Sequence, residues 1–161
     1  MCGAFSWHIG WATWEQIARH AQDDYPSECC GIVTRYPDGN CRVHRCENIQ
    51  DRLHAHDTKA HPRDSRTAYR MDDLQVGRIL RETEAQGGCL VGFYHSHIDC
   101  DAYFSSEDRA AATFWGEPVY AGVVYLVVSV VDGRVCGQKG FQWDDGTRAF
   151  VEVILTVGPA R

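Results

Sequence analysis

The sequence has no apolar run long enough to cross a membrane. Its longest apolar stretch, Val123 to Val131, is interrupted by Ser129 and falls far short of the ~20 residues that a spanning helix needs. Positive charge is also scarce, because 16 lysine and arginine residues face 22 aspartate and glutamate residues and leave a net charge of −6. That is the wrong sign for a protein that binds nucleic acid through its phosphates. We therefore expect neither a membrane nor a nucleic acid as a partner.

Glycine and proline, at 15 and 5 residues, are too few for a linker-rich or collagen-like chain. Hydrophobic residues make up 44% of the chain and charged residues 24%, a balance that excludes wholesale disorder. A chain of 161 residues can bury a core without covalent cross-links, and this length favours one domain over two. The sequence predicts a single domain over residues 1–161.

The eight cysteines lack the spacing of a disulfide framework. No pair is spaced C-x2-C, Cys29 and Cys30 are adjacent, and the others are scattered along the chain. The N-terminus shows no basic segment followed by an apolar one, as a secretory signal would. We expect reduced and mostly buried cysteines in a cytoplasmic protein.

Hydrophobic periodicity predicts alternating helices and strands. Thr13 and Gln16 have the spacing of a capping box, which would open a helix with an apolar face that extends to Ala21. The polar residues 50–70 have no periodicity and are expected to form a long loop. Further helices are predicted over residues 71–86, ended by Gly87-Gly88, and 105–115, and strands over residues 29–36, 41–46, 89–95, 122–131, 134–141 and 149–157. These elements indicate an α/β or α+β fold with a mixed β-sheet flanked by helices.

Residues suited to catalysis gather at the end of the predicted strand 89–95. His95 and His97 are two positions apart, so their imidazoles lie on one side of an extended segment. Ser105 and Asp108 follow, at a spacing that also fits the N-terminal cap of the next helix. Two imidazoles and one carboxylate can hold a tetrahedral Zn²⁺ and leave a fourth position open, as catalytic zinc sites do.

A water molecule on such a zinc ion has its pKa lowered to roughly 7 and becomes a nucleophile near neutral pH. A carboxylate beside the metal would accept its proton, and Glu28, at the start of the first predicted strand, is the candidate. The alternative is a solvated histidine pair beside a helix that Ser105 and Asp108 merely cap. Spacing alone leaves both interpretations open.

The H-S-H motif at 95–97, followed by Ser105 and Asp108 and preceded by Glu28, resembles the signature of the JAMM (MPN+) zinc metalloprotease family. Residues 26–31 also resemble the family's P-x-E-x-C-G opening, and Gly92-Phe93-Tyr94 before the first histidine fits as well. The resemblance covers about residues 5–155 and implies one MPN/JAB-like domain of cytidine-deaminase-like architecture. Ile98 departs from the family, because many members have proline there, and this change affects loop geometry rather than the ligand set.

The resemblance implies that His95, His97 and Asp108 bind one zinc ion, that Glu28 is the general base and that Ser105 stabilises the oxyanion. Among the members of this family, the stand-alone bacterial ones resemble the chain best. They imply hydrolysis after the C-terminal Gly-Gly of a ubiquitin-like sulfur-carrier protein, with release of cysteine or a short peptide.

Other functions stay open on the sequence alone. One is a non-catalytic binding scaffold of the same fold, and another is a deubiquitinase-like isopeptidase that acts on lysine conjugates. A zinc deaminase would need H-x-E and P-C-x-x-C ligands, which this sequence does not have. In the polar loop, His54, His56 and His61 could form a second metal site together with Asp57 and Asp64. Cys100 could approach the metal as a redox-sensitive thiolate.

Overall fold

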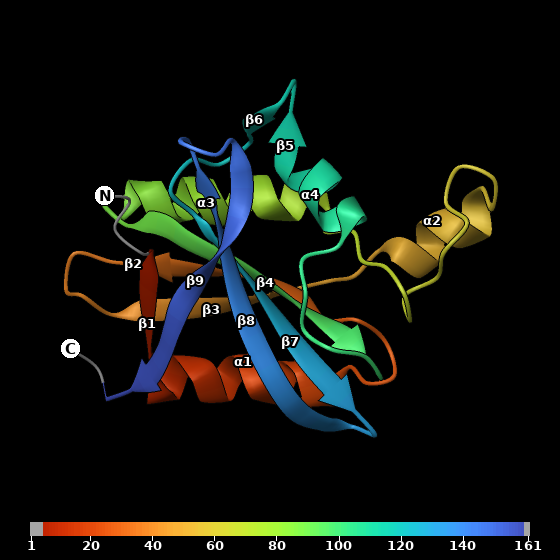
Figure 1. Ribbon diagram of the computed structural model, residues 1–161, viewed down its shortest axis with the longest axis horizontal. Helices are drawn as coiled ribbons and strands as arrows, with labels where there is room; N and C mark the ends of the chain where they lie inside the picture. Colours follow the sequence, from red (N-terminus) through yellow and green to blue (C-terminus); the bar gives the residue numbers. More distant parts are fainter. Residues whose placement is uncertain (1–4, 160–161) are drawn as a thin grey trace.

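A mixed seven-stranded β-sheet forms the centre of the protein in a computed structural model, which describes residues 5–159 (Figure 1). The sheet order is β1-β9-β8-β7-β4-β2-β3, in which β1 pairs parallel with β9 and β4 with β7, while the other pairs are antiparallel. The strands are β1 (Ser6–Gly10), β2 (Cys30–Arg35), β3 (Cys41–Cys46), β4 (Cys89–Ile98), β7 (Val124–Val131), β8 (Arg134–Asp144) and β9 (Ala149–Gly158), with β5 (Thr113–Phe114) and β6 (Glu117–Pro118) in a separate two-stranded sheet. The helices are α1 (Trp11–Asp23), α2 (Gln50–His56), α3 (Asp73–Ala85) and α4 (Ser106–Ala112).

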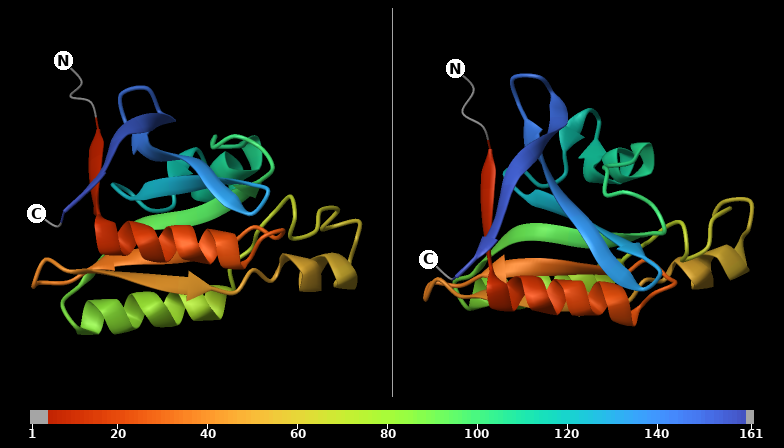
Figure 2. Two further views of the ribbon diagram at one scale, coloured as in Figure 1. Left: turned by 90° about the horizontal axis from the view of Figure 1, so that it is seen from below. Right: turned by 60° about the horizontal axis from the view of Figure 1, so that its bottom comes forward.

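Helices cover both faces of the sheet, and the sheet separates the core into two layers. Ile17 and Ala21 of α1 are buried in one layer, together with side chains of β2, β4 and β7. Ile79 of α3 and Ala112 of α4 are buried in the other layer. Figure 2 shows α1 and α3 on opposite sides of β2 and β3. The predicted α+β class, a mixed sheet flanked by helices, is confirmed; among residues 5–159 no helix has the length and apolarity to span a membrane.

Several predicted elements occur close to their expected positions. The hairpin of β2 and β3, the helix α3 and the C-terminal strands match the periodicity to within a few residues. Gly87, with φ of +73°, follows the end of α3 as the glycine stop predicts. β4 runs three residues beyond its prediction to Ile98, so both histidines of the H-S-H motif belong to the strand.

Two predictions of local structure, near the N-terminus and in the polar segment, are wrong, and one strand has no counterpart among the predicted elements. α1 begins at Trp11 with Gly10 as its N-cap and without a side-chain cap, so Thr13 lies within the helix and opens no capping box. Gln50–His56 form the short helix α2 inside the segment predicted as a loop. The strand β1 was not predicted, because its partner β9 lies at the other end of the chain and no local pattern reveals it.

The helix predicted over residues 105–115 ends at Ala112. Thr113–Phe114 and Glu117–Pro118 pair instead as a hairpin around Trp115 and Gly116. Both central residues have positive φ, 52° and 75°, which is the backbone geometry that joins two strands through a two-residue loop. The turn therefore ends the helical pattern before Trp115.

Seven cysteines lie within the described residues, and all seven are free thiols. The expectation that most of them are buried is wrong. Cys2 lies outside the described residues. Cys29, Cys30 and Cys46 are buried and Cys41 is half-buried, whereas Cys89, Cys100 and Cys136 are exposed.

A glycine at position 31 lets β2 and β4 pair beneath a tyrosine ring. Gly31 lies opposite Tyr94 in the β2–β4 register, and a Cβ atom on Gly31 would overlap the Tyr94 ring. The Tyr94 hydroxyl is hydrogen-bonded to Nδ1 of His20 in α1 at 2.7 Å, and Nε2 of His20 lies 3.1 Å from Asp24. The ring therefore cannot move aside without breaking a buried link between the sheet and α1.

We expect Gly31→Ala to lower the free energy of unfolding by about 2–4 kcal/mol, because overpacking and loss of the His20 hydrogen bond add together. Denaturant unfolding measures this change. Gly137→Ala is the matched control, since nothing lies within 4 Å of a Cβ atom at position 137 of β8. Its effect should stay within about 1 kcal/mol. Equal losses in the two variants would contradict the packing argument.

Candidate metal centre

Three buried side chains from β4 and α4 meet where the strand leads into the helix. His95 and His97 come from the end of β4, and Asp108 comes from the first turn of α4. The two histidine Nε2 atoms are 3.2 Å apart, and they lie 3.4 and 3.6 Å from the two oxygens of Asp108. Within residues 5–159, no other group of three or more histidine, cysteine, aspartate or glutamate side chains gathers its ligand atoms this closely.

The donor set and its spacing fit a zinc ion. Tetrahedral zinc with bonds of about 2.0–2.1 Å places its ligand atoms roughly 3.3–3.4 Å apart, close to the separations of this group. Nδ1 of His97 donates to the carbonyl of Asp101 at 3.1 Å, because a carbonyl oxygen can only accept. The neutral His97 ring therefore carries its lone pair on Nε2, the atom that faces His95 and Asp108.

The charges of the group also suit a cation. Burial opposes ionisation of Asp108, but the neighbouring imidazoles of His95 and His97, which donate to it and attract it when they are protonated, hold its pKa well below the usual range. Burial lowers the pKa of His95, which favours the neutral ring. Burial also acts against a charge on His97, but the hydrogen bond with Asp108 and the charge of Glu28 raise its pKa above the ordinary value. A metal would displace a proton from His97, so metal affinity should fall as the pH decreases.

Ser105 caps α4 and fixes the position of Asp108. The Ser105 hydroxyl oxygen accepts from the Asp108 backbone N–H at 3.0 Å, and the Ser105 N–H donates to Asp108 Oδ2 at 2.9 Å. This capping box satisfies two backbone donors of the helix start and places the carboxylate in the first turn. The hydroxyl acts as an acceptor in the cap, so its proton is available for donation into the cavity that Ser105 lines.

Glu28 is held beside the metal-ligating group from the segment just before β2. The sequence placed it at the start of the first predicted strand, but that strand is the second in the structure, because β1 precedes it, and it begins only at Cys30. The Cys29 N–H donates to Ser96 Oγ at 2.8 Å, which joins this segment to the strand of the two histidines. Glu28 is buried, and its burial raises the pKa of the carboxyl to about 8, although positive charge on His97 and Arg63 opposes the shift.

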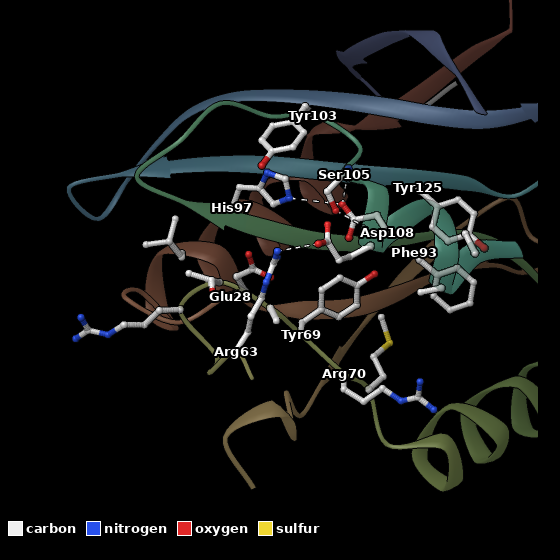
Figure 3. Close-up of a pocket in the computed structure, with 18 of the residues that line it drawn as sticks. Glu28, Arg63, Tyr69, Arg70, Phe93, His97, Tyr103, Ser105, Asp108 and Tyr125 are labelled. Atoms are coloured by element: carbon white, nitrogen blue, oxygen red, sulfur yellow. Dashed lines mark hydrogen bonds and ion pairs between the residues drawn. The ribbon is translucent and has the colours of Figure 1, made fainter. Parts of the chain in front are cut away.

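Glu28, His97, Ser105 and Asp108 line a cavity of about 640 Å³ (Figure 3). Figure 3 shows Glu28, His97, Ser105 and Asp108 turned toward one another, with Tyr69 close by. The Tyr69 ring stacks on His95 with centroids 4.4 Å apart. Tyr69 lines the cavity, whereas His95 is buried and does not line it. The rest of the cavity is lined partly by apolar and aromatic side chains, among them Met71, Val76, Phe93, Ala112, Val119, Tyr120 and Tyr125, and partly by charged ones, among them Arg63, Arg66, Arg70, Asp73 and Glu107.

The structure brings together all five predicted site residues and adds two from the polar segment, Tyr69 and Arg63. Their segment has no periodicity, and nothing in the sequence signals that it folds back over the histidines. His54, His56 and His61 do not form a ligand group within the described residues; His54 Nδ1 lies 2.7 Å from the carbonyl of His61. Cys100 lines the cavity but does not join the three ligand side chains.

The sequence of this chain matches a known family over most of its length. Residues 12–143 match the family described as prokaryotic homologs of the JAB domain, and all five predicted site residues fall in that range. The chain belongs to this prokaryotic JAB family. It is 32% identical over 131 residues to a desampylase of Haloferax volcanii, and the aligned part covers 78% of this chain and 81% of the relative. It is also 32% identical over 130 residues to a CysO-cysteine peptidase of Mycobacterium tuberculosis, with coverage of 81% and 77%.

Solved structures share the fold of this JAB-family protein. A protein from Desulfitobacterium hafniense superimposes with a TM-score of 0.68 at 20% identity, over 94% of this chain and 92% of the other. A protein from Salinibacter ruber gives a TM-score of 0.56 at 24% identity, over 95% and 90%. At these identities the likeness shows the fold alone. The predicted membership of the JAMM-type family is confirmed by the family match and the two relatives.

Proposed function

We propose that this JAB-family protein is a zinc-dependent metallopeptidase, with residues 1–161 as one domain and the cytoplasm as its compartment. Its proposed reaction is hydrolysis of the bond after the C-terminal Gly-Gly of a ubiquitin-like sulfur-carrier protein, with release of cysteine or a short peptide. The observation that carries the proposal is the buried group of His95, His97 and Asp108, of which His97 and Asp108 line a cavity together with Glu28. The names of the two relatives, desampylase and CysO-cysteine peptidase, support it.

In this mechanism His95, His97 and Asp108 would hold one zinc ion, which when bound supplies the Lewis-acid chemistry that activates water and polarises the scissile carbonyl. Glu28 accepts a proton from the attacking water and passes it to the departing amine as the carbon–nitrogen bond breaks. The hydroxyl of Ser105 donates to the carbonyl oxygen as negative charge develops there. The products are the carrier with a free carboxylate and the released amine.

Aromatic rings beside the ligands favour glycine in the substrate. Tyr69 stacks on His95, and Tyr103 lies edge-on to His97 with centroids 4.7 Å apart. Both tyrosines line the cavity, so their rings narrow the approach to the ligand group. Glycine has no side chain and the freest backbone torsions, and two successive glycines pass such rings with the least obstruction.

The substrate proposal predicts a strong preference for Gly-Gly. The test uses the CysO–cysteine conjugate, for which the mycobacterial relative is named, with either Gly-Gly or Ala-Ala immediately before the cysteine. We expect Ala-Ala to reduce kcat/KM at least ~10²-fold, about 2.7 kcal/mol of transition-state binding. Mass spectrometry of both products identifies the cleaved bond. Equal cleavage of the Ala-Ala form, or of short peptides without the carrier, would contradict the substrate proposal.

Ser105→Ala separates capping from catalysis. We expect a loss of about 1 kcal/mol in unfolding free energy, from the lost cap, and a fall in kcat of ~10²-fold or more, from the lost donor. Ser105→Thr keeps the hydroxyl and should restore most of both. The control is Asp72→Ala, which removes the side-chain cap of α3 outside the cavity and should lower stability without lowering kcat. A Ser105→Ala enzyme with normal turnover would leave this serine with a capping role only.

A further inference from the structure

Arg63, in the segment between α2 and α3, lines the cavity (Figure 3). Its Nη2 donates to Glu107 Oε1 at 2.7 Å, so the pair joins this segment to the helix that carries Asp108. Both side chains are about half exposed, at 50% and 55%. Exposed ion pairs are weak, and this one uses a single hydrogen bond of the five that a guanidinium can donate. A second carboxylate can therefore share or take over the guanidinium.

The backbone around Arg63 is anchored to the segment that carries Glu28. The buried Gln50 side chain donates to the Arg63 carbonyl at 2.7 Å. Two residues further on, Ser65 donates from its N–H and hydroxyl to Asp51 at 2.7 and 2.8 Å, and its carbonyl accepts from the Glu28 N–H at 2.7 Å. Arg63 therefore keeps a defined place relative to Glu28.

Arg63 lies on the side of the site from which the leaving group departs, and the position of Glu28 identifies that side. In the proposed mechanism Glu28 gives its proton to the departing nitrogen, so the leaving group lies on the Glu28 side. Arg63 lies on that side, because it lines the same cavity as Glu28 and the Glu28 N–H is bonded to the carbonyl of Ser65, two residues after Arg63. When the leaving group is a single amino acid, its free α-carboxylate is separated from the scissile nitrogen by only one carbon atom. That carboxylate comes within reach of a cation beside Glu28.

We infer that Arg63 is a specificity-determining residue that binds the free α-carboxylate of a single departing amino acid. The inference rests on the proposed function and names the class of leaving group. A planar guanidinium matches the two oxygens of a carboxylate, which makes such a pair strong and directional. An isopeptide-linked lysine presents a methylene chain instead of a carboxylate next to its nitrogen, so Arg63 offers it no partner. The site should therefore favour one C-terminal residue over a lysine conjugate.

The experiment compares three substrates built on one carrier: CysO ending in Gly-Gly-Cys as the free acid, the same conjugate as the C-terminal amide, and CysO joined through Gly-Gly to the side chain of lysine amide. We expect the wild-type enzyme to cleave the acid about 10- to 100-fold more efficiently in kcat/KM than the amide or the lysine conjugate. Arg63→Gln should remove this preference by slowing cleavage of the acid alone. Arg70→Gln is the matched control, because Arg70 lines the same cavity but donates to Asp73 at 3.0 and 3.3 Å; the preference should survive.

A binding measurement separates recognition from turnover. Calorimetry with the zinc-loaded Glu28→Gln variant should give a Kd for the acid at least ~10-fold lower than for the amide, and adding Arg63→Gln should make the two equal. Equal cleavage and equal binding of acid and amide by the wild-type site would overturn the role of Arg63 and leave the peptidase proposal intact. Retention of the preference in Arg63→Gln would also overturn it. If none of the three conjugates is cleaved, the proposed function itself is wrong.

Discussion

The double variant His95→Ala, His97→Ala is expected to contain almost no zinc, whereas the unmodified protein should hold about one zinc ion per chain. Two of the three ligand side chains disappear, and the remaining carboxylate of Asp108 cannot hold the ion alone. Peptidase activity should fall at least ~10³-fold, because several kcal/mol of charge stabilisation is lost with the metal. Elemental analysis of dialysed protein and the carrier cleavage assay measure the two effects.

Asp108→Asn tests the third ligand with less disturbance of α4. Its amide oxygen can still accept from the Ser105 N–H, so the capping box survives while the anionic ligand is lost. His54→Ala combined with His56→Ala is the control, since these histidines lie in α2 and outside the ligand group. The control should keep its zinc and its activity. Full zinc occupancy in the His95, His97 double variant would refute the metal site.

Glu28→Gln should keep zinc bound and lower the rate of carrier cleavage by about 10²- to 10⁴-fold. Glutamine preserves the size of the side chain and its hydrogen bonding but cannot accept the proton of the attacking water. In the metal-free protein burial raises the pKa of Glu28 to about 8, and a dication held by the neighbouring ligands would favour the ionised form that a base requires. Single-turnover kinetics and zinc analysis on the same preparation measure the two properties.

Two outcomes would change the assignment of Glu28. Loss of zinc in Glu28→Gln would make the carboxylate a ligand, and near-normal turnover would remove it from catalysis. Glu152→Gln is the control, because Glu152 pairs with Lys139 on the exposed face of β8 and β9, outside the cavity. That variant should match the unmodified protein in both zinc content and rate.

Local sequence patterns identified much of the fold. Strand-like segments bounded by turn residues located β2, β3 and the strands from β7 to β9, with β7 visible as a nearly continuous apolar run, and glycine located the end of α3. The patterns failed where a tertiary contact or a turn decides the structure. β1 exists because it pairs with β9, and α4 ends early because Trp115 and Gly116 adopt positive φ in a hairpin turn. Neither feature has a periodicity of its own.

The residues of the site were also readable in the sequence, because their spacing follows local geometry. Two histidines at alternate positions of a strand share a face, and Ser105 with Asp108 has the spacing of a capping box. Glu28, which is far from the histidines in the chain, was a candidate because the chemistry needs a carboxylate beside the metal, and the family resemblance implied the same role. The sequence by itself therefore determined the donor types, their spacing and the family.

Only the tertiary structure decided how close these groups come and what surrounds them. β2 pairs with β4, and this pairing carries Glu28 to the histidines across 67 positions of the chain, as the Cys29–Ser96 contact shows. Tyr69 and Arg63 reach the site because Ser65 and Gln50 anchor a polar segment without periodicity. Long-range backbone pairing and side-chain hydrogen bonds place these residues, and neither leaves a repeating pattern in the local sequence.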